Sequence, residues 1–342
     1  MIRNGLTMLD AMRGYARPAL TLSMLLLIGG AVGCGGGGSG ALPSNGPAVI
    51  ATIPVGNMPV DLALNASTGL IYVANSDSGN LSVIDRTTNR VTTTIPVGGS
   101  PFGVAVNSAS NTIYVVDSAS AHLLAINGAT NEVTGTIPVG ASPTVVAADA
   151  ITGRLYVVNT GGGSVSVIDE ASFTVIATIP VGSEPEGIYV DSAANRIYIA
   201  NHGDNTLSVI NGATETDLLT IAVGTAPEGI GIDPTTGQLF VANEGASASV
   251  PSTVLILNIA TGQLITTVTA GLSPDGVAVD ASAGRVYVEN EDSSDVTVID
   301  AGTGVVTATI PVGRSPEAII EDPSTQRVYT ANIDGGNVSV ID

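Results

Sequence analysis

One pattern of apolar and polar positions recurs seven times along most of the chain. In its fourth copy, an apolar run at residues 196–201 (Arg-Ile-Tyr-Ile-Ala-Asn) precedes a second run at residues 207–210 (Leu-Ser-Val-Ile). A glycine after a third recurring run, Ile-Pro-Val-Gly or a variant of it, marks the period at Gly56, Gly98, Gly140, Gly182, Gly224, Gly271 and Gly313. Successive marks lie 42 residues apart, except that an insertion at residues 244–253 lengthens one step to 47. A fixed period of this length predicts a repeat fold.

Each period contains four short runs with the composition of β-strands. In the fourth copy these runs are residues 187–191, 196–201, 207–211 and 217–223. The sequences between them, such as Asp-Pro-Thr-Thr-Gly, supply side chains that cap turns and glycines that adopt positive φ. A proline ends most of the fourth runs, and proline is tolerated on edge strands because it has no N–H to donate. We therefore expect the fourth strand at the outer edge of its sheet.

The pattern predicts an all-β fold, a seven-bladed β-propeller with four-stranded antiparallel blades over residues 47–342. The runs are almost continuously apolar, as expected where blades stack face to face and both faces of each sheet are covered. The last third run, at residues 338–342, has no fourth run after it, and residues 48–55 form a fourth run with no blade before it. Pairing these two runs would complete the last blade and close the ring without an open sheet edge.

The motif Tyr-Val-Ala-Asn followed by Val-Ser-Val-Ile-Asp resembles the YVTN-family β-propeller repeat of bacterial and archaeal cell-surface and periplasmic proteins. The resemblance covers all seven repeats, although Ala or Val mostly replaces Thr at the third position of the motif. It implies the propeller fold and an envelope location. Similar propellers include surface-layer proteins, lactonase-like enzymes, a streptogramin-lyase type and the haem domain of a nitrite reductase, so the resemblance leaves the activity open.

The first 46 residues carry the features of an export signal and a tether. Arginines precede an apolar run that is short for a membrane span, which indicates a signal peptide at residues 1–33. The small residues before Cys34 and the Gly-rich segment at residues 34–46 resemble a bacterial lipoprotein signal. We expect export to the cell envelope and lipidation of Cys34, the single cysteine. Secretion with a free Cys34 and an uncleaved anchor are the alternatives.

Composition and charge narrow the classes of partner. The chain has no lysine, a net charge of −20 and 12% charged residues, with 44% hydrophobic residues. Low charge content with this apolar fraction indicates an ordered chain. The acidic balance argues against nucleic acid and against direct binding to anionic membranes, so we expect membrane association only through a lipid anchor. It favours a basic protein, an envelope component or a cationic ligand as the partner, and we expect a monomer.

The acidic residues fall unevenly on the two faces of the predicted ring. The turns that enter the first strands and those between the second and third strands share one face, which we call the entry face. When the residues after position 34 are assigned to the two faces in this way, the entry face has fifteen acidic residues and one basic residue, Arg314. The opposite face has fourteen acidic residues and six arginines. The entry face is therefore the more acidic of the two, near −14 (15 minus 1) against −8 (14 minus 6).

Four consecutive repeats place a carboxylate directly after the proline that opens the first strand. These residues are Glu186, Glu228, Asp275 and Glu317. Because first strands line the central channel of a propeller, the four are candidate ligands for a divalent cation such as calcium, or would raise one another's pKa. The alternative is that they are solvated acids of a common repeat variant. Phe102 and the insertion at residues 244–253 border the same face and are candidates for shaping a pocket.

Other recurrent or reactive residues have structural explanations. The ring of amides and acids at the ends of the second strands is expected to cap turns: Asn75, Asp117, Asn159, Asn201, Asn243, Asn290 and Asn332. His122 and His202 lack companions in a metal or triad pattern and are expected on the surface. No nucleophile motif is present. These observations favour a non-enzymatic, envelope-anchored binding scaffold without a cofactor. The alternative is a divalent-metal-dependent, lactonase- or lyase-like enzyme with its site at the channel mouth.

Overall fold

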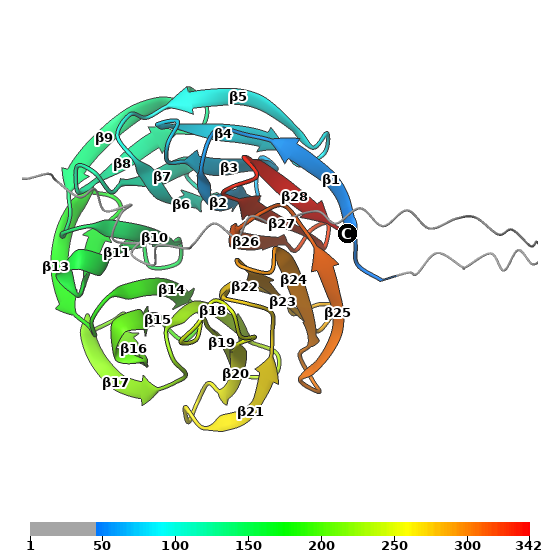
Figure 1. Ribbon diagram of the computed structural model, residues 1–342. Helices are drawn as coiled ribbons and strands as arrows, with labels where there is room; N and C mark the ends of the chain where they lie inside the picture. Colours follow the sequence, from blue (N-terminus) through cyan, green and yellow to red (C-terminus); the bar gives the residue numbers. More distant parts are fainter. Residues whose placement is uncertain (1–45) are drawn as a thin grey trace, which may run out of the picture. The chain divides into compact units, whose positions relative to one another are not determined.

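The computed structural model describes residues 46–342 and shows seven four-stranded antiparallel sheets arranged in a ring (Figure 1). Residues Pro47–Asp342 form one compact unit. The predicted signal peptide, Cys34 and nearly all of the predicted tether lie outside the described residues. None of the helices in residues 46–342 is long and apolar enough to span a membrane.

The blades are numbered 1 to 7 by the chain order of their inner strands. In blades 1 to 6 the strands run outwards from the channel in chain order. The inner strands are β2 (Pro59–Asn65), β6 (Pro101–Asn107), β10 (Pro143–Asp149), β14 (Pro185–Asp191), β18 (Pro227–Asp233), β22 (Pro274–Asp280) and β26 (Pro316–Asp322). The second strands are β3 (Leu70–Asn75), β7 (Thr112–Asp117), β11 (Arg154–Asn159), β15 (Arg196–Asn201), β19 (Gln238–Asn243), β23 (Arg285–Asn290) and β27 (Arg327–Asn332). First strands thus begin at the proline, two residues earlier than the apolar run predicted in the fourth copy.

The third and outer strands complete the blades. The third strands are β4 (Asn80–Asp85), β8 (His122–Asn127), β12 (Ser164–Asp169), β16 (Thr206–Asn211), β20 (Thr253–Asn258), β24 (Asp295–Asp300) and β28 (Asn337–Ile341). The outer strands are β5 (Arg90–Pro96), β9 (Glu132–Pro138), β13 (Thr174–Pro180), β17 (Thr216–Ala222), β21 (Leu264–Thr269), β25 (Val305–Pro311) and β1 (Val49–Pro54). Two short 3₁₀ turns, η1 (Thr160–Gly162) and η2 (His202–Asp204), follow β11 and β15.

The predicted closure of the ring is present. Strand β1 pairs antiparallel with β28, with Ile53 opposite Val338, and the sheet order is β1-β28-β27-β26. The backbones of Ala48 and Asp342 exchange two further hydrogen bonds of 3.1 Å. The N-terminal strand therefore serves as the outer strand of blade 7, and the ends of the described chain meet in one sheet.

A second contact at the seam joins blade 1 to blade 7 on the face opposite the entry face. The Arg86 guanidinium of blade 1 donates two hydrogen bonds, of 2.9 and 3.0 Å, to the carboxylate of Asp322 in blade 7. The Asp322 side chain is 1% exposed and also accepts hydrogen bonds from the hydroxyls of Ser324 and Thr325. Because a buried carboxylate needs such partners, this pair supports the seam of the ring.

The core lies between neighbouring blades and is built by the middle strands. Residues on both faces of the second and third strands are buried, as in β15, where five of the six residues are buried. Tyrosines fill equivalent positions and are fully buried at Tyr72, Tyr156, Tyr198 and Tyr329. This two-sided burial explains the nearly continuous apolar runs, since no blade leaves a face of its central strands in water.

The asparagines at the ends of the second strands have a structural role, but a different one from the predicted turn capping. Asn201 is fully buried, and its amide donates hydrogen bonds of 3.0 Å to the hydroxyls of Thr206 and Ser208 on the third strand. The carbonyl oxygen of the same side chain accepts from the N–H of Gly182. A Cβ at Gly182 would lie 2.6 Å from the Asn201 side chain. The recurrent glycine is therefore required because it packs directly against the asparagine.

Candidate functional site

The entry face forms as the sequence predicts, because the turns assigned to it are hydrogen-bonded to one another. In blade 4, the N–H of His202 after the second strand donates to the carbonyl of Glu184 before the first strand, at 3.0 Å. The same bond recurs in blade 5, from Glu244 to Ala226, at 2.8 Å. Side chains on the two sets of turns thus share the mouth of the central channel, which the inner strands surround (Figure 1).

The four predicted carboxylates occupy equivalent second positions of four adjacent inner strands, β14, β18, β22 and β26. All four side chains are partly buried. The strands approach closely: a Cβ at Gly187 would overlap the backbone carbonyl oxygen of Glu228, and a Cβ at Gly229 would overlap that of Asp275. The glycine in Pro-Glu-Gly is therefore required by the contact between neighbouring blades, which brings successive carboxylates around the channel.

Two of these carboxylates share a hydrogen bond. Glu186 and Glu228 contact each other through their side chains, and this requires a proton on one of them. Burial raises the pKa of Glu228 well above its ordinary value, and the charges of Glu186 and Glu317 raise it further. Burial raises the pKa of Glu186 as well, while the nearby His202 lowers it. We therefore assign the proton to Glu228, which donates to Glu186.

Asp275 and Glu317 complete the acidic side of the channel. Burial raises the pKa of Asp275 well above its ordinary value, and repulsion from Glu228 and Glu317 raises it further. Burial also raises the pKa of Glu317, and its next causes are the charges of Glu291 and Glu289. Because ionising all of these groups together would place several negative charges in a confined, poorly solvated space, they retain protons at a pH where exposed carboxyls are ionised.

Two further carboxylates belong to this cluster, although they were not among the predicted site residues. Glu289 on β23 is fully buried, accepts hydrogen bonds from Gly276 N–H at 3.1 Å and from the Thr330 hydroxyl at 2.8 Å, and burial raises its pKa to about 8. Asp61 on β2 accepts from Val104 N–H at 2.8 Å, and burial raises its pKa to about 7. The charge of Asp61 also raises the pKa of Glu289. The acidic cluster therefore includes an inner strand of blade 1.

The cluster differs from the acids on the outside of the same face. Asp204, for example, accepts hydrogen bonds from the N–H and the hydroxyl of Ser183 at 2.7 and 2.6 Å, which lower its pKa. Its charge is thus matched by local donors. Among the channel carboxylates, Asp275 and Glu317 have no such donor in the described contacts, so their charge is left for an external group to match.

Apart from Asp61, the first strands of blades 1 to 3 bring no carboxylate to the channel mouth. Blades 1 to 3 place Val60, Phe102 and Thr144 at the position where blades 4 to 7 place a carboxylate. Val60 and Thr144 are buried, and Phe102 packs on the core cluster of blades 1 and 2. The Thr144 hydroxyl bonds to that of Thr160 at 2.7 Å. The mouth is therefore polarised, with an acidic half and a neutral half.

His202 lies within the acidic half, where it is partly exposed and has carboxylate neighbours that the sequence did not predict. Its Nε2 is 3.2 Å from a carboxylate oxygen of Glu244, and its Nδ1 is 3.9 Å from Glu184. The hydrogen bond with Glu244 and the charge of Glu186 raise the pKa of His202, against an opposing effect of burial. The imidazolium form therefore matches part of the negative charge between blades 4 and 5.

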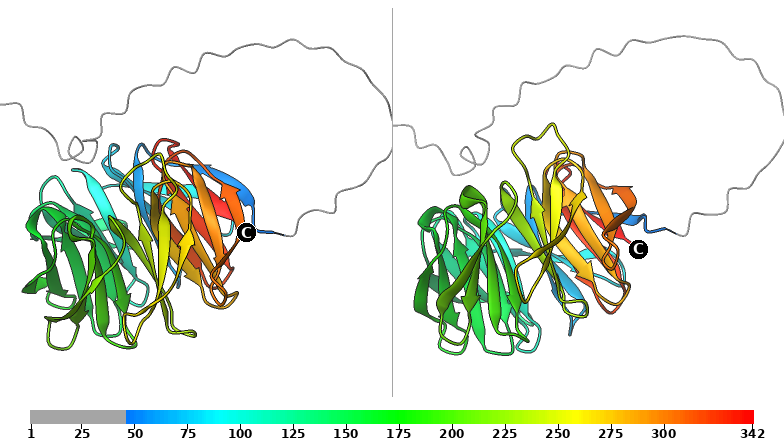
Figure 2. Two further views of the ribbon diagram at one scale, coloured as in Figure 1. Left: turned by 60° about the horizontal axis from the view of Figure 1, so that its bottom comes forward. Right: turned by 90° about the horizontal axis from the view of Figure 1, so that it is seen from below.

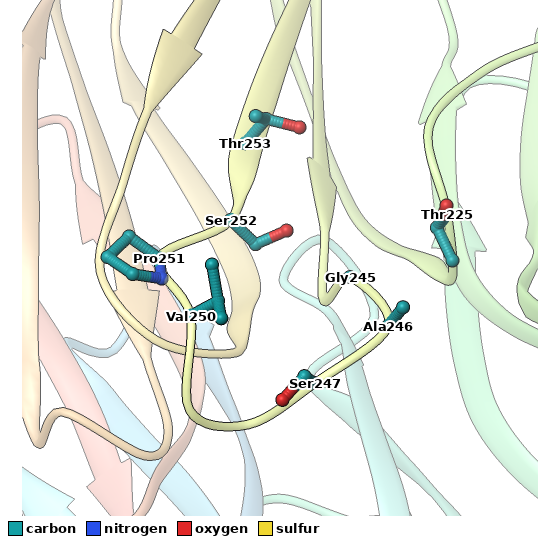
Figure 3. Close-up of a pocket in the computed structure, with 8 residues that line it drawn as sticks. All are labelled: Thr225, Gly245, Ala246, Ser247, Val250, Pro251, Ser252 and Thr253. Carbon is teal, nitrogen blue, oxygen red and sulfur yellow. The ribbon is translucent and has the colours of Figure 1, made fainter.

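The insertion of blade 5 borders this face and projects from the ring (Figure 2). It lines an open pocket of about 360 Å³ against Thr225 of the preceding turn (Figure 3). The lining consists of small and hydroxyl residues with the exposed apolar side chains of Val250 and Pro251, and no charged group. The insertion thus shapes the rim of the mouth, and its first residue, Glu244, contacts His202.

The geometry of a metal site is not present in the described chain. Among residues 46–342, no three His, Cys, Asp or Glu side chains are grouped so that they could hold a metal ion. The sequence prediction of calcium ligands at Glu186, Glu228, Asp275 and Glu317 remains a prediction, since side chains can move towards a cation. In the arrangement described, burial and mutual repulsion favour the protonated, uncharged form of these carboxyls.

Comparison with known proteins identifies the fold. No protein-family model matches the chain, and no curated protein matches it. Among solved structures, hydrazine synthase of Kuenenia stuttgartiensis is similar, with a TM-score of 0.75 and 16% identity over 83% of this chain and 95% of that chain. In all, 1654 chains of solved structures are similar, and a fold that recurs so often does not specify an activity. The site must therefore be interpreted from its own chemistry.

Proposed function

We propose that this protein is a non-enzymatic binding scaffold that takes up a cationic group at the acidic half of its channel mouth. The supporting observation is the set of channel carboxyls whose pKa values are raised by burial: Asp61, Glu186, Glu228, Asp275, Glu289 and Glu317. A positive group placed among them would remove their mutual repulsion and let them ionise, which is a source of binding free energy. The resemblance to YVTN-family repeats and the lipoprotein-like Cys34 support a location at the cell envelope.

The ligand is best supplied by a basic protein segment or a cationic envelope component. A guanidinium group offers several N–H donors to carboxylates at once, and it stays charged under all conditions. The neutral half of the mouth, around Phe102, offers apolar surface for the carbon chain of such a residue. A divalent-metal-dependent enzyme is the alternative, but the carboxyls of the described chain are not grouped as metal ligands.

The test is calorimetric titration of the purified protein with a hexa-arginine peptide and, separately, with calcium, magnesium and manganese. We expect the peptide to bind, and Glu228→Gln to weaken it about tenfold, because one carboxylate partner of a cationic group is lost. Glu132→Gln, an exposed residue on the outer strand β9, is the matched control and should leave affinity unchanged. Tight divalent binding that Glu228→Gln abolishes would instead establish the metal-dependent alternative.

A further inference from the structure

The outer edges of blades 4 and 5 lack a residue that the other blades share. The outer strand ends in proline in five blades, at Pro54, Pro96, Pro138, Pro180 and Pro311. It ends in Ala222 on β17 and in Thr269 on β21, and both residues are exposed. Since proline is one of the residues that protect a sheet edge against pairing with another chain, these two edges are less protected.

The missing prolines leave backbone donors that point away from the blade. The residue after the strand donates its N–H inwards in every blade, for example Val223 to Asn205 O in blade 4 and Val181 to Gly163 O in blade 3, both at 3.0 Å. Neighbouring residues of a strand direct their N–H groups to opposite sides. The N–H of Ala222 therefore points outwards, where Pro180 has none.

The residue at the bulge of the outer strand is of two kinds. In blades 1, 2 and 6 it is a threonine whose hydroxyl donates to a third-strand carbonyl at 3.2 Å: Thr92, Thr134 and Thr307. In the other four blades it is an exposed aliphatic residue: Ile50, Ile176, Leu218 and Ile265. On β17 and β21 this apolar residue lies on an edge that also lacks the proline, and such an edge is typical of a surface that pairs with another chain.

The chemistry beside β17 indicates the partner. A groove of about 390 Å³ lies between blades 3 and 4 and is lined on β17 by Asp217 and Thr220, while its other carboxylate, Asp204, is already paired with Ser183. A second copy of this chain is a poor occupant, because each copy carries a net charge of −20 and would set Asp217 against its own counterpart. A basic side chain fits the groove by charge.

We propose that the outer edge of blade 4 binds an extended peptide segment of another protein as a fifth strand on β17. The segment pairs its backbone with the outward-pointing groups around Ala222 and covers Leu218 and Leu219 with apolar side chains. A lysine or arginine of the segment enters the groove beside Asp217. This surface lies on the outer rim and is separate from the channel mouth.

The test uses a fluorescein-labelled nine-residue peptide that alternates valine with arginine and threonine. A second version carries N-methyl groups on alternate amides, so that it keeps its charge and side chains but cannot pair as a strand. We expect the unmodified peptide to bind wild type at least about tenfold more tightly than the methylated one, because strand addition depends on main-chain hydrogen bonds. Equal affinity of wild type for the two peptides would overturn the proposal.

Two variants that introduce residues found at these positions in other blades locate the site. Ala222→Pro and Leu218→Thr should each reduce the preference for the unmodified peptide to about twofold or less, because the proline removes the outward N–H and the threonine removes an apolar contact. Both should fold, since prolines and threonines occupy these positions in other blades, and circular dichroism checks this. Thr269→Pro is the matched control and should retain binding. Loss of binding in the Thr269→Pro variant, or unchanged binding in the Ala222→Pro variant, would overturn the assignment to β17.

Discussion

A Gly187→Ala variant is expected to lose about 3 kcal/mol of unfolding free energy, with a fall in Tm of about 6 °C or more. The added methyl group would overlap the backbone carbonyl oxygen of Glu228 on the next inner strand, and a backbone atom cannot rotate away as a side chain can. Two inner strands must therefore separate at the channel. Thermal and urea unfolding followed by circular dichroism measure the effect.

Gly302→Ala is the matched control for this substitution. A Cβ at Gly302 would lie 3.6 Å from Asp300 Oδ1, which is an ordinary contact, and the residue is not in the left-handed region. Its unfolding free energy should stay within about 0.5 kcal/mol of wild type. Equal stability of Gly187→Ala and Gly302→Ala would show that the inner strands do not pack as closely as described.

A Glu289→Gln variant is expected to be more stable than wild type at alkaline pH and equally stable in acid. Burial raises the pKa of Glu289 from its ordinary value of 4.5 to about 8, so the folded protein binds more protons than the unfolded chain between these values. Stability from this group is complete below pH 4.5 and is lost as the pH rises through about 8. The variant should gain about 2–4 kcal/mol at pH 8, because glutamine keeps the shape without the buried charge.

Thermal unfolding of wild type and Glu289→Gln from pH 4 to pH 9 measures this difference, with the exposed Glu132→Gln as a control. Glutamine can still accept from Gly276 N–H and interact with the Thr330 hydroxyl, so its hydrogen bonds are maintained. Parallel stability curves for wild type and Glu289→Gln would mean that Glu289 is solvated and has an ordinary pKa.

The repeat made the fold predictable, including its closure. The 42-residue period, the turn residues and the unmatched fourth strand at residues 48–55 are all local features of the chain, and each survives in the structure. Even the edge prolines indicated which strand lies outermost. The asparagine ring was correctly interpreted as structural, but its partners were not predicted, because the hydroxyls that bind Asn201 belong to a neighbouring strand.

The members of the channel cluster were only partly predictable. The four acids after the proline share one repeat position, so the ring geometry brings them around the channel. Glu289 occupies a position where the other blades have Ala or Val, and this departure from the repeat was the available signal. Asp61 replaces a residue that is glycine in four blades. Their burial depends on packing between blades, which one repeat cannot show.

The contacts of His202 were beyond prediction for a related reason. Its partner Glu244 begins the insertion of the next blade, and no repeat unit contains both residues. Contacts between the insertion and its neighbours follow from the path of one irregular loop. Residues that depart from the repeat thus belong to the site, and their arrangement depends on how the blades assemble into the ring.

The most direct test of the proposed cation site is the number of protons released when the hexa-arginine peptide binds. Calorimetry at about pH 6.5 in buffers of different ionisation enthalpy measures it, because a bound cation favours the ionised form of carboxyls that had retained their protons. The proposal predicts release of about 0.5 proton or more per peptide, and a smaller release for the combined variant Glu228→Gln, Asp275→Asn and Glu317→Gln. Binding without proton release, or unchanged release in the combined variant, would contradict it.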